Sequence, residues 1–310
     1  MLKHKAIRYI LFFFALLAAI SGNAASYAET SALNTGKWVK IKVEDTGIYQ
    51  ISAATLSGWG FSDISKVKIF GYGGAMISEI MGNGYIDDLP QVPVMRSGNR
   101  ILFYAQSNVS WTETSGKIRF QQQQNPYATA GYYFITDRND IDVAEMQTTA
   151  KAEKASDKVI TNTLARIYHE KELTAPGTTG RTLLGEDFRS AGTQSFQFNL
   201  PGIVSDTDPV VNVAFAAYHT SGTARALTVT SGKQEVMKVS VSSLSGSNEY
   251  DICSTASSIG TVSYPGEKMT LQLSFPTGTA VRLANLDYIT VNYLRNLNLA
   301  DKQIDFRSFT

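Results

Sequence analysis

Apolar and polar residues alternate along residues 38–43, where Val and Ile take one set of positions and Trp and Lys take the other. A period of two is typical of a β-strand that buries one face. The next residues, 44–47, end in a glycine, which adopts positive φ at low cost and favours a turn. A second alternating run follows at 48–51. The pattern predicts a β-hairpin over 38–51.

The remainder of the first half consists mainly of short runs rich in Val, Ile, Tyr, Phe and Thr, separated by Gly, Asn, Asp and Pro. Such runs predict strands rather than helices. One exception is Ser52–Gly58, where Ser52 suits an N-cap and Gly58 suits a helix end. The glycine-rich stretch 71–74 is expected to be a turn. The predicted strands are 38–43, 48–51, 66–71, 101–105, 117–121 and 131–136.

The second half alternates in short segments at close and regular spacing. An antiparallel β-sandwich buries strands of this kind on one face, and we expect a jelly roll. In the last segment Ile289, Val291 and Tyr293 are expected to face opposite to the residues between them. The predicted strands are 159–169, 196–200, 211–215, 226–230, 236–241, 269–275 and 289–293.

The segment 145–158 is charged, lacks aromatic residues and has little apolar periodicity, so we interpret it as a linker. The chain is therefore expected to be all-β, with two β-rich domains. The first is an N-terminal β-rich domain at 29–144, and the second is a jelly-roll-like sandwich at 159–310. A mature length of about 280 residues suits two domains of ordinary size.

Residues 1–28 have the pattern of an export signal. Three basic residues precede an apolar core at 10–20, which is too short to span a bilayer comfortably. Small residues follow, and cleavage is expected after Ala24 or Ala28. No later apolar run is long enough for a transmembrane helix. We therefore expect an exported chain in the periplasm, at the outer-membrane surface or outside the cell.

Net charge adds little to this picture. The full chain has 28 basic and 27 acidic side chains and a formal net charge of +1. The leader carries three of the basic side chains and none of the acidic ones, so 25 basic and 27 acidic side chains remain after cleavage at Ala28. No basic tract is present, which argues against a nucleic-acid partner.

Candidates for catalytic chemistry are few. Beyond the leader the chain has one cysteine, Cys253, and two histidines, His169 and His219. A cysteine peptidase needs a thiolate with a base within hydrogen-bond reach, and Cys253 lies in no recognisable signature. We expect Cys253 to be a small buried hydrophobe, and the spacing of the three residues matches no zinc site. We predict no catalytic residue and no zinc ligand.

Two acidic segments are the candidates for a cation. The segment 137–142 lacks the glycine and the distant glutamate of an EF-hand, so we interpret it as a polar turn. Asn83, Asp87 and Asp88 could ligate calcium through carboxylate and carbonyl oxygens, with an acidic hairpin loop as the alternative. The glycine-rich stretch 71–74 opens no helix, which argues against a phosphate site. No other cofactor is predicted.

Several segments, in the same order, resemble the sortases of the type IX secretion system of Bacteroidetes, which are related to the gingipain cysteine peptidases. The similarity covers nearly the whole chain after the leader. No single motif is specific, and the ordered succession carries the resemblance. The segments are GKWVKIKVEDTGIYQI (36–51), SKVKIFGYGG (65–74), DDLP (87–90), ILFYAQ (101–106), NPY (125–127), GYYF (131–134), YHEKE (168–172), GR (180–181), GEDF (185–188), LDYITVNY (286–293) and Arg295.

The resemblance implies a non-catalytic N-terminal region of a larger protein. The parent would remove C-terminal secretion signals from cargo and attach the cargo to cell-surface lipopolysaccharide. It also implies partners in an outer-membrane attachment complex, with positioning as the role of this chain. The sequence departs from the family at its end: the Cys–His peptidase domain is expected to begin after about Phe306, and the sequence stops at Thr310. No catalytic residue therefore carries over.

Five aromatic residues are expected as contacts for a partner or a glycan, because interfaces favour such side chains. In the family pattern Trp111 is expected in a loop after the strand at 101–106. The alternative is that these side chains fill the core of the first domain. The five residues are Trp59, Trp111, Tyr127, Tyr132 and Tyr133.

A free-standing carbohydrate-binding surface module is the alternative function. Sandwich domains often bind sugars on aromatic platforms, although the fold alone does not license that function. A free hydrolase would require Cys253, and the small set of candidate residues argues against it. The tyrosines of the predicted sandwich that could stack on a sugar are Tyr218, Tyr250, Tyr264, Tyr288 and Tyr293.

Overall fold

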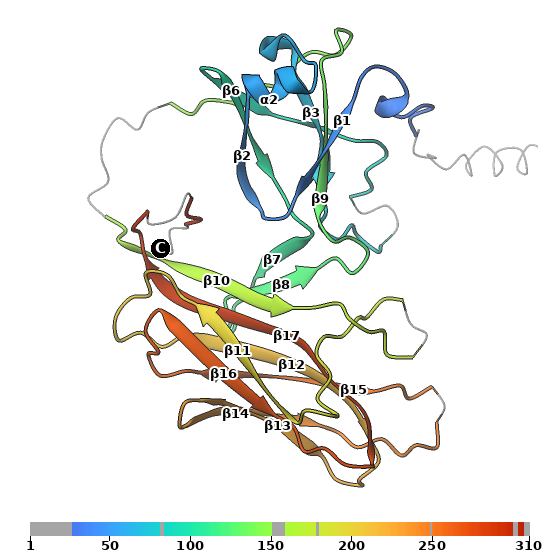
Figure 1. Ribbon diagram of the computed structural model, residues 1–310, viewed down its shortest axis with the longest axis vertical. Helices are drawn as coiled ribbons and strands as arrows, with labels where there is room; N and C mark the ends of the chain where they lie inside the picture. Colours follow the sequence, from blue (N-terminus) through green and yellow to red (C-terminus); the bar gives the residue numbers. More distant parts are fainter. Residues whose placement is uncertain are drawn as a thin grey trace, which may run out of the picture.

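The computed structural model describes residues 27–80, 84–150, 159–177, 180–248, 250–299 and 303–306. The predicted leader lies outside these residues except for Tyr27 and Ala28. Antiparallel strands form two lobes, one above the other in Figure 1, and each lobe has its own cluster of buried apolar side chains. The all-β fold is therefore confirmed. The domain bounds at 29–144 and 159–310 remain a prediction.

Two sheets enclose the core of the first lobe. One has the strand order β1-β9-β3-β4 and the other has the order β2-β6-β5. Val43, Ile101 and Ile135 are completely buried between them. The strands are β1 (Val39–Val43), β2 (Gly47–Ser52), β3 (Lys68–Gly73), β4 (Gln91–Val92), β5 (Val94–Ser97), β6 (Arg100–Ala105) and β9 (Gly131–Thr136), with short 3₁₀ turns at η1 (Ala32–Asn34) and η2 (Ile64–Lys66).

The hairpin predicted over 38–51 is wrong. β1 pairs with β9 and β2 pairs with β6, so two strands that follow each other in sequence belong to different sheets. The turn between them carries the chain across the lobe, and Tyr49 Oη donates to the carbonyl oxygen of Asp45 at 2.9 Å. Alternation located both strands and their buried faces, because Val43 and Ile51 both lie in the core. It contains no information on which strand becomes the hydrogen-bonded neighbour.

The short helix predicted after the second strand is confirmed as α2 (Ala53–Gly58). Ser52 is the N-cap, and its hydroxyl oxygen accepts a hydrogen bond from the Thr55 amide at 3.0 Å. That bond satisfies one of the amides that the first turn leaves without a partner. Leu56 is the buried residue of the helix, so one side of α2 covers the core of the first lobe.

The glycine-rich stretch at 71–74 is not the predicted turn, because β3 continues through Gly73. Its pairing with β9 is irregular between Phe70 and Gly73, which marks a bulge. Gly71 has a φ of +137°, and a Cβ there would lie 2.9 Å from the carbonyl oxygen of Tyr132. Glycine is therefore required by the close approach of two strands, as isolated glycines within a strand often are. Tyr72, between the glycines, is exposed.

A β-hairpin extends from the first lobe toward the second. It consists of β7 (Val109–Glu113) and β8 (Phe120–Gln124). Trp111, expected in a loop, lies within β7, and the strand predicted at 117–121 is displaced to 120–124. The glutamines at 121–124 give no apolar alternation, so the sequence pattern could not define this strand or its limits.

The second lobe is a sandwich of two four-stranded sheets, with orders β10-β17-β12-β15 and β11-β16-β13-β14. Its core contains Phe215, Leu271 and Val291, all completely buried. Eight strands in two sheets is the strand count of a jelly roll, and that finer assignment remains a prediction. The strands are β10 (Asn162–Glu170), β11 (Thr193–Asn199), β12 (Val210–His219), β13 (Arg225–Ser231), β14 (Gln234–Val241), β15 (Ser254–Thr261), β16 (Lys268–Ser274) and β17 (Val281–Asn296).

Two strands of the sandwich differ from expectation. β15 has the sequence STASSIGT, which lacks apolar alternation, and it was not predicted. β17 spans Val281–Asn296, far more than the predicted 289–293. Its side chains alternate as expected, with Ile289 and Val291 in the core, while Thr290 and Asn292 on the opposite face are also buried. Burial on both faces means that another part of the chain covers the face of this sheet that points away from the sandwich core.

The predicted linker begins on the first lobe. The Val94 amide donates to the carbonyl of Ala144 at 2.9 Å, and the Met146 amide donates to the carbonyl of Val94 at 2.9 Å. Glu145 also forms an ion pair with Arg96 of β5. The first two residues of the segment 145–158 are therefore attached to β5, and residues 151–158 lie outside the described part of the chain.

Candidate functional site

The β7–β8 hairpin lies across the outer face of the β10-β17-β12 sheet, and we call this contact the domain junction (Figure 1). The Phe120 amide donates to Asn292 Oδ1 at 2.7 Å, and Asn292 Nδ2 donates to the Phe120 carbonyl at 3.0 Å. Asn212 Nδ2 donates to Gln121 Oε1 at 2.8 Å. Buried polar groups need such partners, so the junction explains why polar residues of β12 and β17 are buried.

Arg166 of β10 is a central residue of the junction. Its guanidinium carbon lies 5.3 Å from the ring centroid of Trp111 and 4.7 Å from that of Phe120. Trp111 also meets Tyr168 edge to face, with centroids 5.7 Å apart. Arg166 Nη2 donates to Asp305 Oδ2 at 2.5 Å. One cation therefore contacts two rings of the first lobe and a carboxylate beyond the last strand.

The segment Gln303–Phe306 contacts both lobes. Asp305 pairs with Arg166 of the sandwich, and Gln303 Oε1 accepts a hydrogen bond from the Ile48 amide of β2 at 3.0 Å. A Cβ at Gly47 would lie 2.8 Å from Gln303 Oε1, so glycine at that position permits the approach. The chain that leaves the sandwich thus returns to the first lobe.

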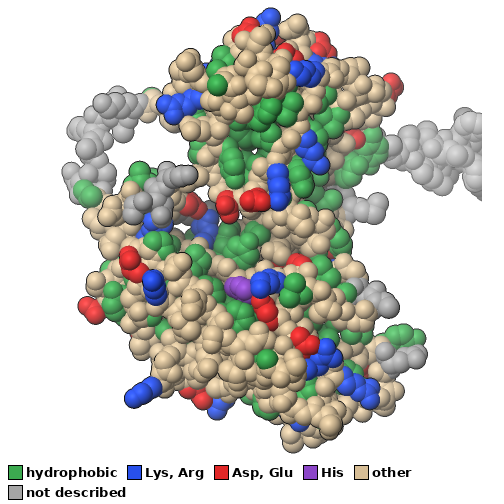
Figure 2. Space-filling view, in the orientation of Figure 1, with side chains coloured by type: hydrophobic (Ala, Val, Ile, Leu, Met, Phe, Trp, Pro, Cys, Tyr) green, Lys and Arg blue, Asp and Glu red, His purple; other side chains and the backbone are tan. Residues whose placement is uncertain are grey.

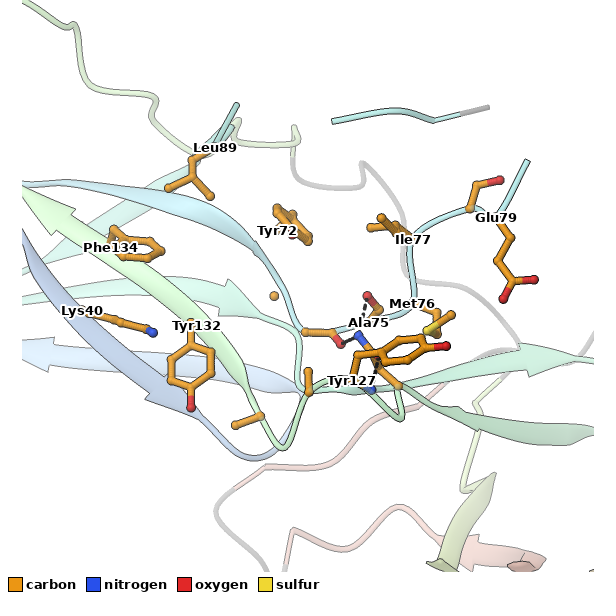
Figure 3. A pocket seen from close by; sticks show the side chains of 16 residues that line it. Lys40, Tyr72, Ala75, Met76, Ile77, Glu79, Leu89, Tyr127, Tyr132 and Phe134 are labelled. Carbon is orange, nitrogen blue, oxygen red and sulfur yellow. Dashed lines mark hydrogen bonds between the residues drawn. The ribbon is translucent and has the colours of Figure 1, made fainter. Parts of the chain in front are cut away.

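The first lobe also has a groove of about 650 Å³, which we call the aromatic groove. Strands β1 and β9 contribute side chains at one end, the loop after β3 contributes the other end, and Tyr72 lies between them (Figure 3). Tyr72 and Tyr127 are 41% and 66% exposed, so their rings are available to a partner. The defining residues are Lys40, Tyr72, Ile77, Leu89, Tyr127, Tyr132 and Phe134.

The electrostatics of the aromatic groove are simple. Lys40 Nζ lies 3.9 Å from the ring centroid of Tyr132 and 6.0 Å from that of Phe134, a cation–π arrangement. Glu79 lines the groove and pairs at 2.8 Å with Arg181 of the second lobe. The lining contains no cysteine or histidine. The groove can therefore stack against and hydrogen-bond a bound group, and its lining lacks the cysteine and histidine that a gingipain-like cysteine peptidase needs.

The five predicted aromatic contacts lie in different places. Tyr127 and Tyr132 line the aromatic groove, and Trp111 belongs to the domain junction. Trp59 is packed against the first core. Tyr133 is 3% exposed, and its hydroxyl oxygen accepts from the Gln106 amide at 2.8 Å, so it is a core residue and not a surface contact. The rings are therefore not one binding patch.

Two sets of residues at these sites were missed. Tyr72 could have been found, because glycines on both sides of an aromatic residue within a strand indicate a bulge. The junction residues on β8 are Gln121, Gln122 and Gln124, which make side-chain hydrogen bonds to the sandwich. A run of glutamines gives no signal for an interface, since partners in the second lobe are distant in sequence.

The residues proposed for calcium have other partners. Asp88 Oδ1 accepts from the Leu89 amide at 2.8 Å and from Ser31 Oγ at 3.2 Å, and Oδ2 accepts from the Ala32 amide. Burial works to raise the pKa of Asp88, but these hydrogen bonds outweigh it and lower the pKa. Asp87 accepts from the Ala28 amide. Both carboxylates hold the segment that precedes β1, while Asn83 lies outside the described residues.

The contacts of His169, His219 and Cys253 are those of residues that stabilise the fold and not those of a catalytic site. His219 is completely buried, with Nδ1 3.0 Å from Ser221 Oγ and Nε2 3.2 Å from the carbonyl of Val241. His169 Nε2 lies 2.9 Å from Glu186 Oε1. Burial, and then the nearby Asp287 carboxylate, raise the pKa of Cys253, which disfavours the thiolate. Both ring nitrogens of His219 have partners other than Cys253, so these residues form no catalytic dyad.

Among solved structures, a crystal structure of dimeric latent PorU from Porphyromonas gingivalis matches this chain with a TM-score of 0.75 and 30% sequence identity. This chain resembles PorU. The likeness covers 87% of this chain and 25% of PorU, so the chain spans about a quarter of PorU's length. The resemblance predicted from the ordered sequence segments is confirmed.

Other comparisons add nothing to the PorU resemblance. A family 35 carbohydrate-binding module from Clostridium thermocellum has a TM-score of 0.24 and 11% identity, covering 42% of this chain and 90% of the module. Similarity at that level supports no argument on fold or on sugar binding. No family model and no curated protein matches the chain. None of the helices in the described residues has the length and hydropathy needed to cross a membrane.

Proposed function

We propose that this chain is an exported, non-catalytic module of the type IX secretion sortase kind, which positions proteins in an outer-membrane attachment complex. The observation that carries the proposal is the likeness to PorU over 87% of the chain. The larger protein would process the C-terminal secretion signals of cargo and attach the cargo to the cell surface. Its peptidase chemistry would be carried by residues other than those described here.

The chemistry of the described residues supports a positioning role. Cys253, His169 and His219 have the surroundings of structural residues, and neither cysteine nor histidine lines the aromatic groove. The groove offers exposed rings of the kind that anchor protein interfaces, with Tyr72 and Tyr127 the most accessible. We propose that the aromatic groove is the partner-contacting surface of the module.

Glycan binding is not proposed as a second function, because no observation favours it. Tyr293 is buried in the sandwich core and Tyr288 is half-buried beside the junction. Tyr250 and Tyr264 are exposed, and neither lines the aromatic groove or the smaller hollow beside Asp187 and Arg282.

The test is the intact mass of the native protein, captured from its own cells with an antibody against this region. The proposal expects a mass well above that of this chain, with peptides of a gingipain-like domain in the additional part. It also expects the protein in the outer-membrane fraction. A captured mass equal to that of the exported chain alone would overturn the sortase assignment, and the protein would then be a free-standing module.

The groove is tested by crosslinking in outer-membrane preparations. The wild type is expected to form crosslinks to attachment-complex proteins. The double variant Tyr72→Ser/Tyr127→Ser is expected to lose them. Tyr250→Ser is the matched control, because Tyr250 is 81% exposed on the second lobe, away from the groove. Equal crosslinking by all three proteins would remove the groove from the proposal and leave the sortase assignment to the mass measurement.

A further inference from the structure

Two carboxylates of the sandwich are held by two glutamines of the hairpin. Gln122 Nε2 donates to Glu170 Oε2 at 3.2 Å, and Gln124 Nε2 donates to Glu172 Oε1 at 3.3 Å. The glutamines are two residues apart on β8, so both side chains leave the same face of the strand. Gln122 is itself 6% exposed. The junction therefore brings acidic groups of one lobe against neutral amides of the other.

A third carboxylate belongs to the same cluster. Asp287 precedes Tyr288 on β17, and Tyr288 is the register partner of Glu170. Asp287 and Glu170 repel each other, as do Glu170 and Glu172. Glu170, Glu172 and Asp287 are defined here as the junction carboxylates. Figure 2 shows acidic and basic side chains gathered where the two lobes meet.

No cation is paired with the junction carboxylates among the described residues. On β10, Arg166 pairs with Asp305, and just after β10 Lys171 pairs with Glu186 at 3.0 Å. The elements packed around the cluster supply further weak acids rather than bases. These are Asp45 in the β1–β2 turn, Tyr168 on β10, Tyr288 on β17 and Cys253 before β15.

Burial without a cation favours the neutral form of each carboxyl group. Burial, assisted by Glu172 and Asp287 and opposed by the Gln122 hydrogen bond, raises the pKa of Glu170 to about 7. Burial raises the pKa of Asp287 to about 6. Burial, and then Asp287, also raise the pKa of Glu172. All three shifts have the same sign, so the cluster gains negative charge as the pH rises through the neutral range.

We propose that the domain junction is a pH-sensitive latch, in which the hairpin is held on the sandwich while the junction carboxylates are neutral and loosens as they ionise. A protonated carboxyl group still accepts a hydrogen bond from Gln122 through its carbonyl oxygen. Three carboxylates in a partly buried cluster repel one another when they are ionised. Undocking of the hairpin relieves this repulsion and lets water solvate the charges.

Hydrogen exchange in the full chain tests the latch directly. The Phe120 amide donates to Asn292 across the junction, so its protection reports whether the hairpin is docked. Between pH 5.5 and pH 8.0 we expect its protection factor, corrected for intrinsic exchange, to fall on the order of tenfold. That is the change in the docking equilibrium that corresponds to about one pKa unit. Amides of the sandwich core at Leu271 and Val291 are expected to keep their protection. Small-angle scattering over the same range is expected to show a larger radius of gyration at pH 8.0.

Variants connect the pH effect to the cluster. Glu170→Gln keeps an acceptor for Gln122 and removes the charge, so protection at Phe120 is expected to become nearly independent of pH. Asp287→Asn is a second variant that removes charge from the cluster. Glu235→Gln is the matched control, because Glu235 is an exposed residue of β14 whose partner is Lys238, and it is expected to behave as the wild type.

Two results would overturn the latch. The first is a Phe120 protection factor in the wild type that does not change between pH 5.5 and pH 8.0. The second is an unchanged pH dependence in both Glu170→Gln and Asp287→Asn, provided that the core amides of these variants remain protected. Either result would mean that the junction carboxylates do not control docking of the hairpin.

Discussion

At the scale of single residues, the most informative side chain is Arg166, because it touches three separate parts of the chain. Its guanidinium covers the rings of Trp111 and Phe120 and binds Asp305. The side chain is 18% exposed, so the contacts are made largely out of water. An arginine fits this place because a planar cation can stack on rings and bind a carboxylate at the same time.

Arg166→Ala is expected to lower the free energy of unfolding by about 1–2 kcal/mol, through loss of the cation–π and ionic contacts. Arg166→Lys is expected to recover only part of this, since an ammonium retains the charge but not the planar stacking surface. Urea denaturation of both variants measures the difference. Equal stability of Arg166→Lys and the wild type would mean that charge alone matters at this position.

Gly71→Ala tests the strand bulge that exposes Tyr72. A φ of +137° and a Cβ at 2.9 Å from a backbone oxygen are both unfavourable for alanine, and a loss of about 1–3 kcal/mol is expected. Gly116→Ala is the control, because it has ordinary φ and only the Thr114 hydroxyl at 3.8 Å. The urea midpoint of Gly116→Ala is expected to equal that of the wild type. A neutral effect of Gly71→Ala would show that β3 can shift to accept a side chain.

At the scale of elements, the β7–β8 hairpin is the feature that joins the two lobes. Its attachment depends on Asn292, which makes two hydrogen bonds to the backbone of Phe120. Both groups of Asn292 and the paired backbone are buried. Removing such an asparagine leaves backbone polar groups without partners inside the protein, and this costs more than the bonds contribute when intact.

Asn292→Ala is expected to destabilise the protein by roughly 2–3 kcal/mol and to increase exchange of the Phe120 amide. Asn199→Ala, at the exposed end of β11, is the control and is expected to change stability little. Chemical denaturation and hydrogen exchange measure the two effects. If Asn292→Ala had the stability of Asn199→Ala, the hairpin would not be anchored through this residue.

Element prediction succeeded where one face of a strand is apolar. The strand at 131–136 followed from its run of Tyr, Phe, Ile and Thr, and Ile289 and Val291 of β17 followed from alternation, because burial of one face imposes a period of two. It failed at β15 and β8, which are rich in Ser, Thr, Gly and Gln. Those strands exist because neighbours offer hydrogen bonds to their backbones, and a neighbour distant in sequence leaves no local pattern.

At the scale of the whole molecule, ionisable groups in the sandwich act in opposite directions as the pH changes. Burial by itself would raise the pKa of Glu186, but the hydrogen bonds from Lys171 and His169 outweigh burial and lower the pKa. The stability from Glu186 is present above pH 4.5, near its unfolded pKa, and is lost as the pH falls through the folded pKa. Glu170 and Asp287 have raised values, so the folded state binds more protons than the unfolded state between pH 4 and 7. Their effect is a loss of stability as the pH rises.

Stability is therefore expected to be greatest in mildly acidic solution and to fall by roughly 1–2 kcal/mol between pH 5 and pH 8. This is less than the full pKa shift implies, because the carboxylates are only partly buried and water screens them. Urea unfolding across this range gives the profile, and Glu170→Gln is expected to flatten its upper part. A stability that stays constant or rises up to pH 8 would contradict the raised pKa values.

The sequence by itself determined the all-β class, most strand positions, the short helix and the resemblance that the PorU structure confirms. These follow from local rules, since alternation, caps and glycines act within a few residues. Only the tertiary structure decided that β1 and β2 belong to different sheets, that Tyr133 is buried, and that Gln122 and Glu170 meet at the domain junction. The physical reason is that these outcomes depend on which distant strands pack together. The energy of that packing depends on residues far apart in the sequence, so no single segment determines it.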